Sequence, residues 1–131
     1  MRVKLTALVS AAVLAIAGLA MAAPALATTT DSCVDFGPGA VGAQSCFANT
    51  SDNHVSFAQV QMGRYSAGSF TLVCTEYGDV FVKQGNIGTG GVRSFFTEGL
   101  FGLRDPDCTL AARAHNTKVN KAARVTVTLV D

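Results

Sequence analysis

The sequence contains no tryptophan, two histidines and three prolines, and only 15% of its residues are charged. Without tryptophan, the aromatic residue that marks the core of antibody domains is missing. The two histidines, His54 and His115, lie far apart and exclude an H-E-x-x-H zinc motif, and no G-x-S-x-G nucleophile elbow is present. We therefore expect no enzymatic activity, no metal site and no cofactor.

Phosphate-binding motifs are also absent, although glycine is abundant in the stretch KQGNIGTGGVRSFF (residues 83–96). A dinucleotide site needs G-x-G-x-x-G at a strand-to-helix turn, and a P-loop needs Lys followed by Ser or Thr. Here Val92 and Arg93 follow the last glycine, and no long amphipathic helix comes next. The pattern indicates a loop between two strands, where glycine permits positive φ angles.

The long apolar run of the chain lies at its N-terminus. Arg2 and Lys4 precede an apolar stretch over 5–20, and Ala25-Leu26-Ala27 forms a small-x-small cleavage site. Ala20-Met21-Ala22 offers an earlier site. This pattern predicts a signal peptide over 1–27 and a secreted domain over 28–131, without a membrane contact after cleavage.

Removal of residues 1–27 changes the charge balance of the chain. Two of the ten Lys and Arg residues lie in that segment, so eight remain against nine Asp and Glu. A net charge of −1 provides no overall basic field for nucleic acid. The remaining 104 residues suffice for one domain with a modest core.

Four cysteines remain in the secreted part, and none of them form a C-x-x-C pair. An even number of cysteines in an exported chain predicts disulfides rather than a metal or redox site. We favour Cys33–Cys46, which closes a loop with turn residues at 37–39. The remaining pair, Cys74–Cys108, lies on the inward faces of two predicted strands, and we expect it to cross the core.

Alternating apolar and polar residues predict about seven short strands, most clearly at 69–76 and 122–130. Polar segments at 28–32 and 49–53 are interpreted as a frayed end and a loop, 64–68 as a turn, and 69–84 as a hairpin. The segment 109–124 is compatible with a helix or a strand. We favour a strand over 108–115 and a turn over 116–120, because no Leu, Ile or Phe follows Leu110 at helical spacing.

These features predict an all-β fold, a single antiparallel β-sandwich of immunoglobulin-like or related type. The segment CTLAARAHNTKVNKAARVTVTLV (108–130) resembles the last two strands of an immunoglobulin-like or fibronectin-like domain. The resemblance covers less than a quarter of residues 28–131. A fold of this kind does not by itself determine a function.

The predicted function is that of a secreted binding protein whose partner is another protein or an extracellular surface; the oligomeric state is left open. Alternatives are an inhibitor of an extracellular hydrolase, presenting the loops 37–42 or 85–93, and a carrier of a small apolar ligand. The candidate binding residues are Arg93, Phe95, Phe96 and Phe101, which follow the glycine-rich stretch. The aromatic residues among them are also candidates for the core.

Overall fold

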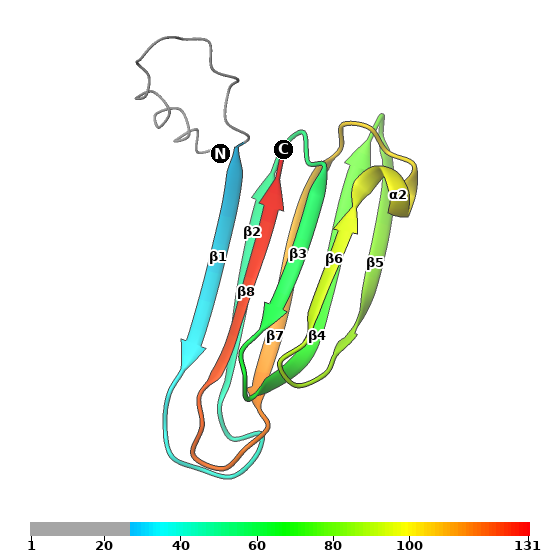
Figure 1. The fold of residues 1–131 in the computed structure, drawn as a ribbon. Helices are drawn as coiled ribbons and strands as arrows, with labels where there is room; N and C mark the ends of the chain where they lie inside the picture. The colour runs from blue at the N-terminus through cyan, green and yellow to red at the C-terminus, as the bar shows by residue number, and fades with distance from the viewer. Residues whose placement is uncertain (1–26) are drawn as a thin grey trace, which may run out of the picture.

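The computed structural model describes residues 27–131, so the predicted signal peptide lies, apart from Ala27, outside the described residues. Within these residues the chain forms eight strands and one short helix (Figure 1). In chain order these are β1 (Thr28–Asp35), β2 (Ser45–Asp52), β3 (Phe57–Met62), β4 (Ser66–Glu76), β5 (Asp79–Ile87), β6 (Val92–Phe96), α2 (Thr97–Phe101), β7 (Asp107–Asn116) and β8 (Ala123–Val130). Within residues 27–131, no helix is long and apolar enough to cross a membrane.

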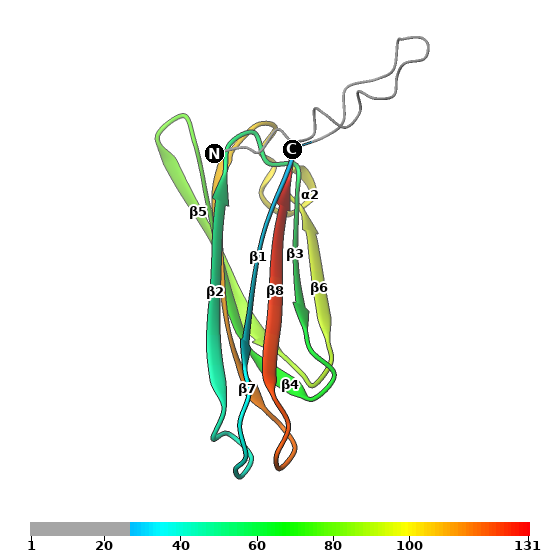
Figure 2. The same ribbon diagram turned by 90° about the vertical axis from the view of Figure 1, so that its left-hand side faces the viewer.

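The strands form two antiparallel four-stranded sheets, which confirms the predicted β-sandwich (Figure 2). The strand order is β1-β8-β3-β6 in one sheet and β2-β7-β4-β5 in the other. The strands pair from the two ends of the chain inward: β1 pairs with β8, β2 with β7, β3 with β6 and β4 with β5. This is the order of a jelly roll, in which a long antiparallel ribbon is folded over on itself, and it differs from the immunoglobulin order.

The core lies between the two sheets and is built from the inward residues of each strand. Strand β8 shows the alternation expected from its sequence, with Val125, Val127 and Leu129 fully buried. Strand β7 contributes Leu110, and β4 contributes Leu72 from the facing sheet. The segment 109–124 is thus a strand followed by a turn, as favoured above, and not a helix.

Both favoured disulfides are present, but they have different places in the fold. Cys33–Cys46 joins β1 of one sheet to β2 of the other. Cys74–Cys108 was expected to cross the core, and this expectation is wrong. The two residues are direct partners on the neighbouring strands β4 and β7, with their Cα atoms 4.1 Å apart.

The polar segments 28–32 and 49–53 were expected to be a frayed end and a loop, but they belong to β1 and β2. The carboxylate of Asp31 accepts a hydrogen bond from the backbone N–H of Asn49 at 2.9 Å, and that of Asp35 accepts one from Ser45 N–H at 3.0 Å. Strand β2 is the edge of its sheet, so these N–H groups have no strand partner on that side. Acidic side chains of β1 therefore close this rim of the sandwich next to the disulfide.

Two further segments differ from their predicted forms. Most of the predicted turn at 64–68 belongs to β4, where a Cβ atom on Gly68 would lie 1.8 Å from the carbonyl oxygen of Arg113. Only glycine permits β4 and β7 to approach this closely. Strand β5 continues to Ile87, so the glycine-rich loop is reduced to residues 88–91. This loop connects two strands, as predicted.

Candidate functional site

The four candidate binding residues do not share one surface. Phe95 and Phe96 are neighbours on β6 and therefore face opposite sides of the sheet. Phe95 packs against the core, with its ring 5.4 Å from that of Phe70, whereas Phe96 is 66% exposed beside Phe57. Phe101 packs against Phe81 at the inner side of α2. A cleft lined by all three rings is therefore not formed.

Arg93 is exposed, and its guanidinium group makes two contacts within the protein. Its Nη2 atom donates a hydrogen bond to the carbonyl of Asn86 at 3.1 Å, and its guanidinium group lies 5.8 Å from the centre of the Phe70 ring. The first contact connects β6 with β5, and the second connects β6 with β4. Of the four residues, Phe96 is the one that presents a large apolar surface to solvent.

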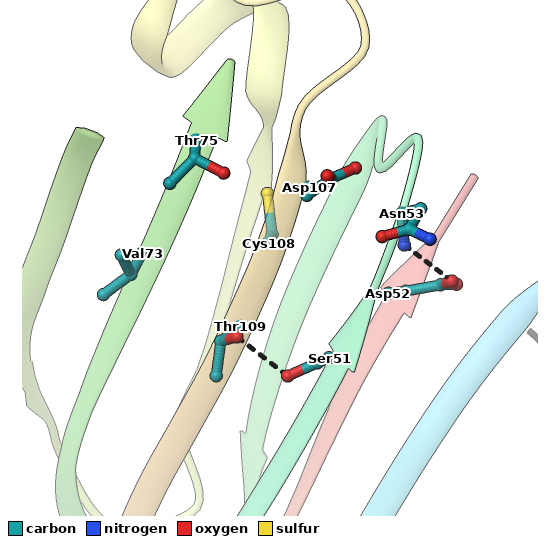
Figure 3. Close-up of a pocket in the computed structure, with 8 residues that line it drawn as sticks. All are labelled: Ser51, Asp52, Asn53, Val73, Thr75, Asp107, Cys108 and Thr109. Atoms are coloured by element: carbon teal, nitrogen blue, oxygen red, sulfur yellow. Dashed lines mark hydrogen bonds between the residues drawn. The ribbon is translucent and has the colours of Figure 1, made fainter. Parts of the chain in front are cut away.

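A depression of about 280 Å³ lies on the outer face of the β2-β7-β4-β5 sheet, near the ends of its strands (Figure 3). The hydroxyl groups of Ser51 and Thr109 hydrogen bond to each other across its floor at 2.8 Å. Asp107 and Thr75 line the side toward α2. The hydroxyl and carboxylate groups of this lining can form hydrogen bonds with a polar molecule.

The same end of the sandwich carries most of the negative charge. Seven of the nine acidic residues lie in its loops or at adjacent strand ends: Asp52, Glu76, Asp79, Glu98, Asp105, Asp107 and Asp131. Some of them are structural, because Glu76 accepts hydrogen bonds from the backbone of Arg104 and Asp105. His54 is exposed and pairs with Asp105 at 2.8 Å. Within residues 27–131, no group of three His, Cys, Asp or Glu residues is arranged to hold a metal ion.

Positive charge gathers at the opposite end of the sandwich. Arg64, Lys118 and Lys121 surround the ring of Tyr65, with their charged groups 5.1–5.3 Å from its centre. Arg124 lies 5.8 Å from the centre of the Phe36 ring. The aromatic rings stabilise the nearby cations by cation–π attraction. Lys118, Lys121 and Arg124 lie close together in the sequence, in the loop 117–122 and at the start of β8, whereas Arg64 comes from the distant loop between β3 and β4.

Three exposed apolar side chains accompany the cations. Phe36 is 71% exposed, and Val41 and Val119 are also exposed. They lie in the loops 36–44 and 117–122, which meet at the lower end of the molecule in Figure 1. We call the surface formed by these three residues together with Arg64, Tyr65, Lys118, Lys121 and Arg124 the basic end.

The loop 36–44 is held from beneath by Asn116, the last residue of β7. This side chain is fully buried, and its Oδ1 atom accepts hydrogen bonds from the N–H groups of Gly42 at 2.9 Å and Gln44 at 3.0 Å. Its Nδ2 atom donates to the carbonyls of Ala40 at 3.1 Å and Lys118 at 3.0 Å. One amide therefore joins both loops of the basic end. All of its donors and acceptors are used.

A second connection joins the tips of the two loops. The backbone N–H of Gly39 donates to the side chain of Asn120 at 2.8 Å, and the N–H of Asn120 donates back to the carbonyl of Gly39 at 2.8 Å. The disulfide Cys33–Cys46 closes the base of the loop. The loop thus has a defined conformation although it contains no regular secondary structure.

Sequence reasoning missed the basic end, apart from naming the loop 37–42 as one that an inhibitor could present. The net charge of −1 hides the separation of positive from negative charge, because the cations come together only when the strands pair. The turn over 116–120 was predicted, but no local pattern indicates that Asn116 is buried. Compared with known proteins, the chain matches no family model, no curated protein and no solved structure.

Proposed function

We propose that this chain is an exported, non-catalytic binding protein that contacts another protein through the basic end. The observation that supports this most is the buried Asn116 amide, which orders both loops beneath an exposed apolar and cationic surface. A loop that is ordered before binding loses less conformational entropy in the complex. The side chains that it presents are therefore effective anchors.

The composition of the basic end indicates the chemistry of the partner. Phe36, Val41 and Val119 provide an apolar centre, and exposed aromatic and aliphatic groups of this kind gain binding energy when they are desolvated. The surrounding cations favour an acidic rim on the partner and accelerate association. The matching surface is thus an apolar patch bordered by Asp and Glu residues.

Reversing two of the four charges tests this proposal. The exported protein is immobilised and exposed to culture supernatant and surface extracts of its source, and bound proteins are identified by mass spectrometry. With Lys118→Glu and Lys121→Glu combined, we expect a partner of the wild-type protein to bind at least about tenfold more weakly.

The matched control is Arg104→Glu, which makes the same kind of charge change at the acidic end of the sandwich. This variant is expected to retain the partner with unchanged affinity. If the partner binds all variants equally well, or loses equal affinity with Arg104→Glu, the basic end is not its binding surface. Added salt should weaken wild-type binding more than binding by the double variant.

A second candidate function is inhibition of an extracellular hydrolase. It is favoured by the loop 37–42, which is exposed, closed at its base by Cys33–Cys46 and ordered from within by Asn116. The expected result in a panel of proteases and glycosidases is inhibition that Val41→Asp abolishes. Absence of inhibition at micromolar protein concentration would exclude this function while leaving the binding proposal intact.

Export is part of the proposal and rests on residues 1–27 together with the two disulfides. Ala27 is buried, and its carbonyl accepts a hydrogen bond from Asp131 N–H at 3.0 Å. Cleavage after Ala22 would retain this contact, and cleavage after Ala27 would remove it. The mass of the protein recovered from the medium distinguishes the two sites; uncleaved protein retained in the cell would contradict export.

A further inference from the structure

Strand β5 forms a long open edge of the β2-β7-β4-β5 sheet (Figure 1). The other edge of this sheet, β2, is covered by Asp31 and Asp35 of β1. On the side of β5, the one side-chain hydrogen bond found within residues 27–131 runs from Arg93 to the carbonyl of Asn86, near the end of the strand. Exposed strand edges pair readily with other strands unless they are protected.

The turn before β5 determines which backbone groups face this open edge. Tyr77 and Gly78 both have positive φ angles, 54° and 84°, as in a two-residue type I′ turn. In such a hairpin the flanking residues Glu76 and Asp79 form a hydrogen-bonded pair. The N–H and C=O groups of Val80, Val82 and Gln84 then point away from β4 to the open edge.

The side chains near the turn are exposed and apolar on the outer face. Val80 is 62% exposed, Val82 is 52% exposed, and Tyr77 at the tip is 96% exposed. The charged residues Asp79 and Lys83 lie on the other face of the strand, on either side of Phe81. Neither has an ion-pair partner within the part of the chain that the structure describes.

We propose that β5 pairs with β5 of a second copy in antiparallel orientation about a two-fold axis at Phe81. In this register Val80 lies opposite Val82 of the second copy, in hydrogen-bonded pairs that use the open backbone groups. Asp79 lies opposite Lys83 of the second copy, and the symmetry produces this pair twice. One register thus satisfies the backbone, the apolar side chains and the charges together.

The charges of Asp79 and Lys83 together favour this register. A charged residue on the inner face of an edge strand normally prevents pairing with another chain. Shifting the axis to Lys83 brings the two Lys83 side chains opposite each other, and like charges in that position are destabilising. The Phe81-centred register instead places each lysine beside a carboxylate. Because the paired strands are antiparallel, the two basic ends of the dimer point in opposite directions.

Exchanging the charges of Asp79 and Lys83 tests the proposed dimer. Sedimentation of the exported wild-type protein is expected to show a concentration-dependent dimer. Lys83→Asp should raise the dissociation constant at least about tenfold, because two carboxylates then face each other on both sides of the axis. Combining Lys83→Asp with Asp79→Lys should restore the dimer. Circular dichroism and thermal unfolding establish that each variant is folded.

A mixed sample of labelled and unlabelled protein tests the register itself. Filtered nuclear Overhauser spectra should show contacts between the methyl groups of Val80 in one copy and Val82 in the other. A wild-type protein that stays monomeric at millimolar concentration overturns the proposal. So does a dimer that Lys83→Asp leaves unchanged, or one that the double exchange does not restore.

Discussion

Replacing Asn116 with alanine is expected to lower the free energy of unfolding by about 4 kcal/mol, measured by chemical denaturation of the folded protein. The substitution removes four side-chain hydrogen bonds and leaves the N–H of the buried Gln44 without its partner, whereas the Ala40 carbonyl still accepts from the N–H of Ala43. Leaving a buried polar group unpaired costs more than the net value of the hydrogen bond that it made. The effect should therefore exceed that of an ordinary loop substitution.

Asn120→Gly is the matched control in the same pair of loops. Asn120 has a positive φ angle of 61°, which glycine adopts without strain, so the change removes chiefly one exposed side-chain hydrogen bond. The expected loss is about 1 kcal/mol. Equal losses for the two variants would show that Asn116 does not organise the loops as described.

Removing the disulfides is expected to cost about 3 kcal/mol for Cys33–Cys46 and about 4 kcal/mol for Cys74–Cys108, because they close loops of different length in the unfolded chain. The sequence separations are 13 and 34 residues. Each pair is replaced by two alanines, and chemical denaturation gives the free energy of unfolding. The reverse order of the two losses would contradict this reasoning.

The two disulfides should also differ in their effect on amide exchange in the loop 36–44. The disulfide that contributes less to stability should have the larger effect there. Cys33–Cys46 closes the base of the loop 36–44, whereas Cys74–Cys108 joins two strands near the acidic end. Loss of the first bridge should therefore accelerate amide exchange in this loop under native conditions. Loss of the second, although more destabilising overall, should leave local exchange there unchanged.

Much of the sandwich could be predicted from local patterns. Strand β8 alternates strictly between buried apolar residues and residues that are exposed or half-buried, and β4 carries Phe70, Leu72 and Cys74 on one face. The pairing of Cys74 with Cys108 was also predicted, although the two residues lie on neighbouring strands and not on opposite sides of the core. The jelly-roll order could not be predicted, because it depends on which distant strands meet, and alternation specifies only the face of each residue.

Strand β1 shows why strands composed largely of polar residues are difficult to predict from the sequence. Its inward positions include Asp31, Cys33 and Asp35, which face the rim of the sandwich rather than the apolar core. Asp31 and Asp35 accept hydrogen bonds there from backbone N–H groups at the edge of β2, which requires polar side chains, and Cys33 forms the disulfide with Cys46. A rule that identifies strands by buried apolar residues therefore assigns such a segment to a frayed end.

Most of the basic end could not be predicted from the sequence, because its residues are brought together only by the fold. Arg64, Lys118 and Lys121 are separated by up to 57 positions and meet only because the ends of β3 and β7 lie at the same end of the sandwich. The aromatic residues favoured from the sequence, Phe95 and Phe101, turned inward, since a core without tryptophan uses phenylalanine to fill its volume.

Amide hydrogen exchange in the loop 36–44 most directly tests whether the basic end is ordered before it meets a partner. The N–H groups of Gly42 and Gln44 both donate to the Asn116 side chain. They are expected to exchange as slowly as amides in the paired strands of the isolated protein. Exchange as fast as in an unstructured, solvent-exposed peptide would contradict a preformed binding surface at this end of the molecule.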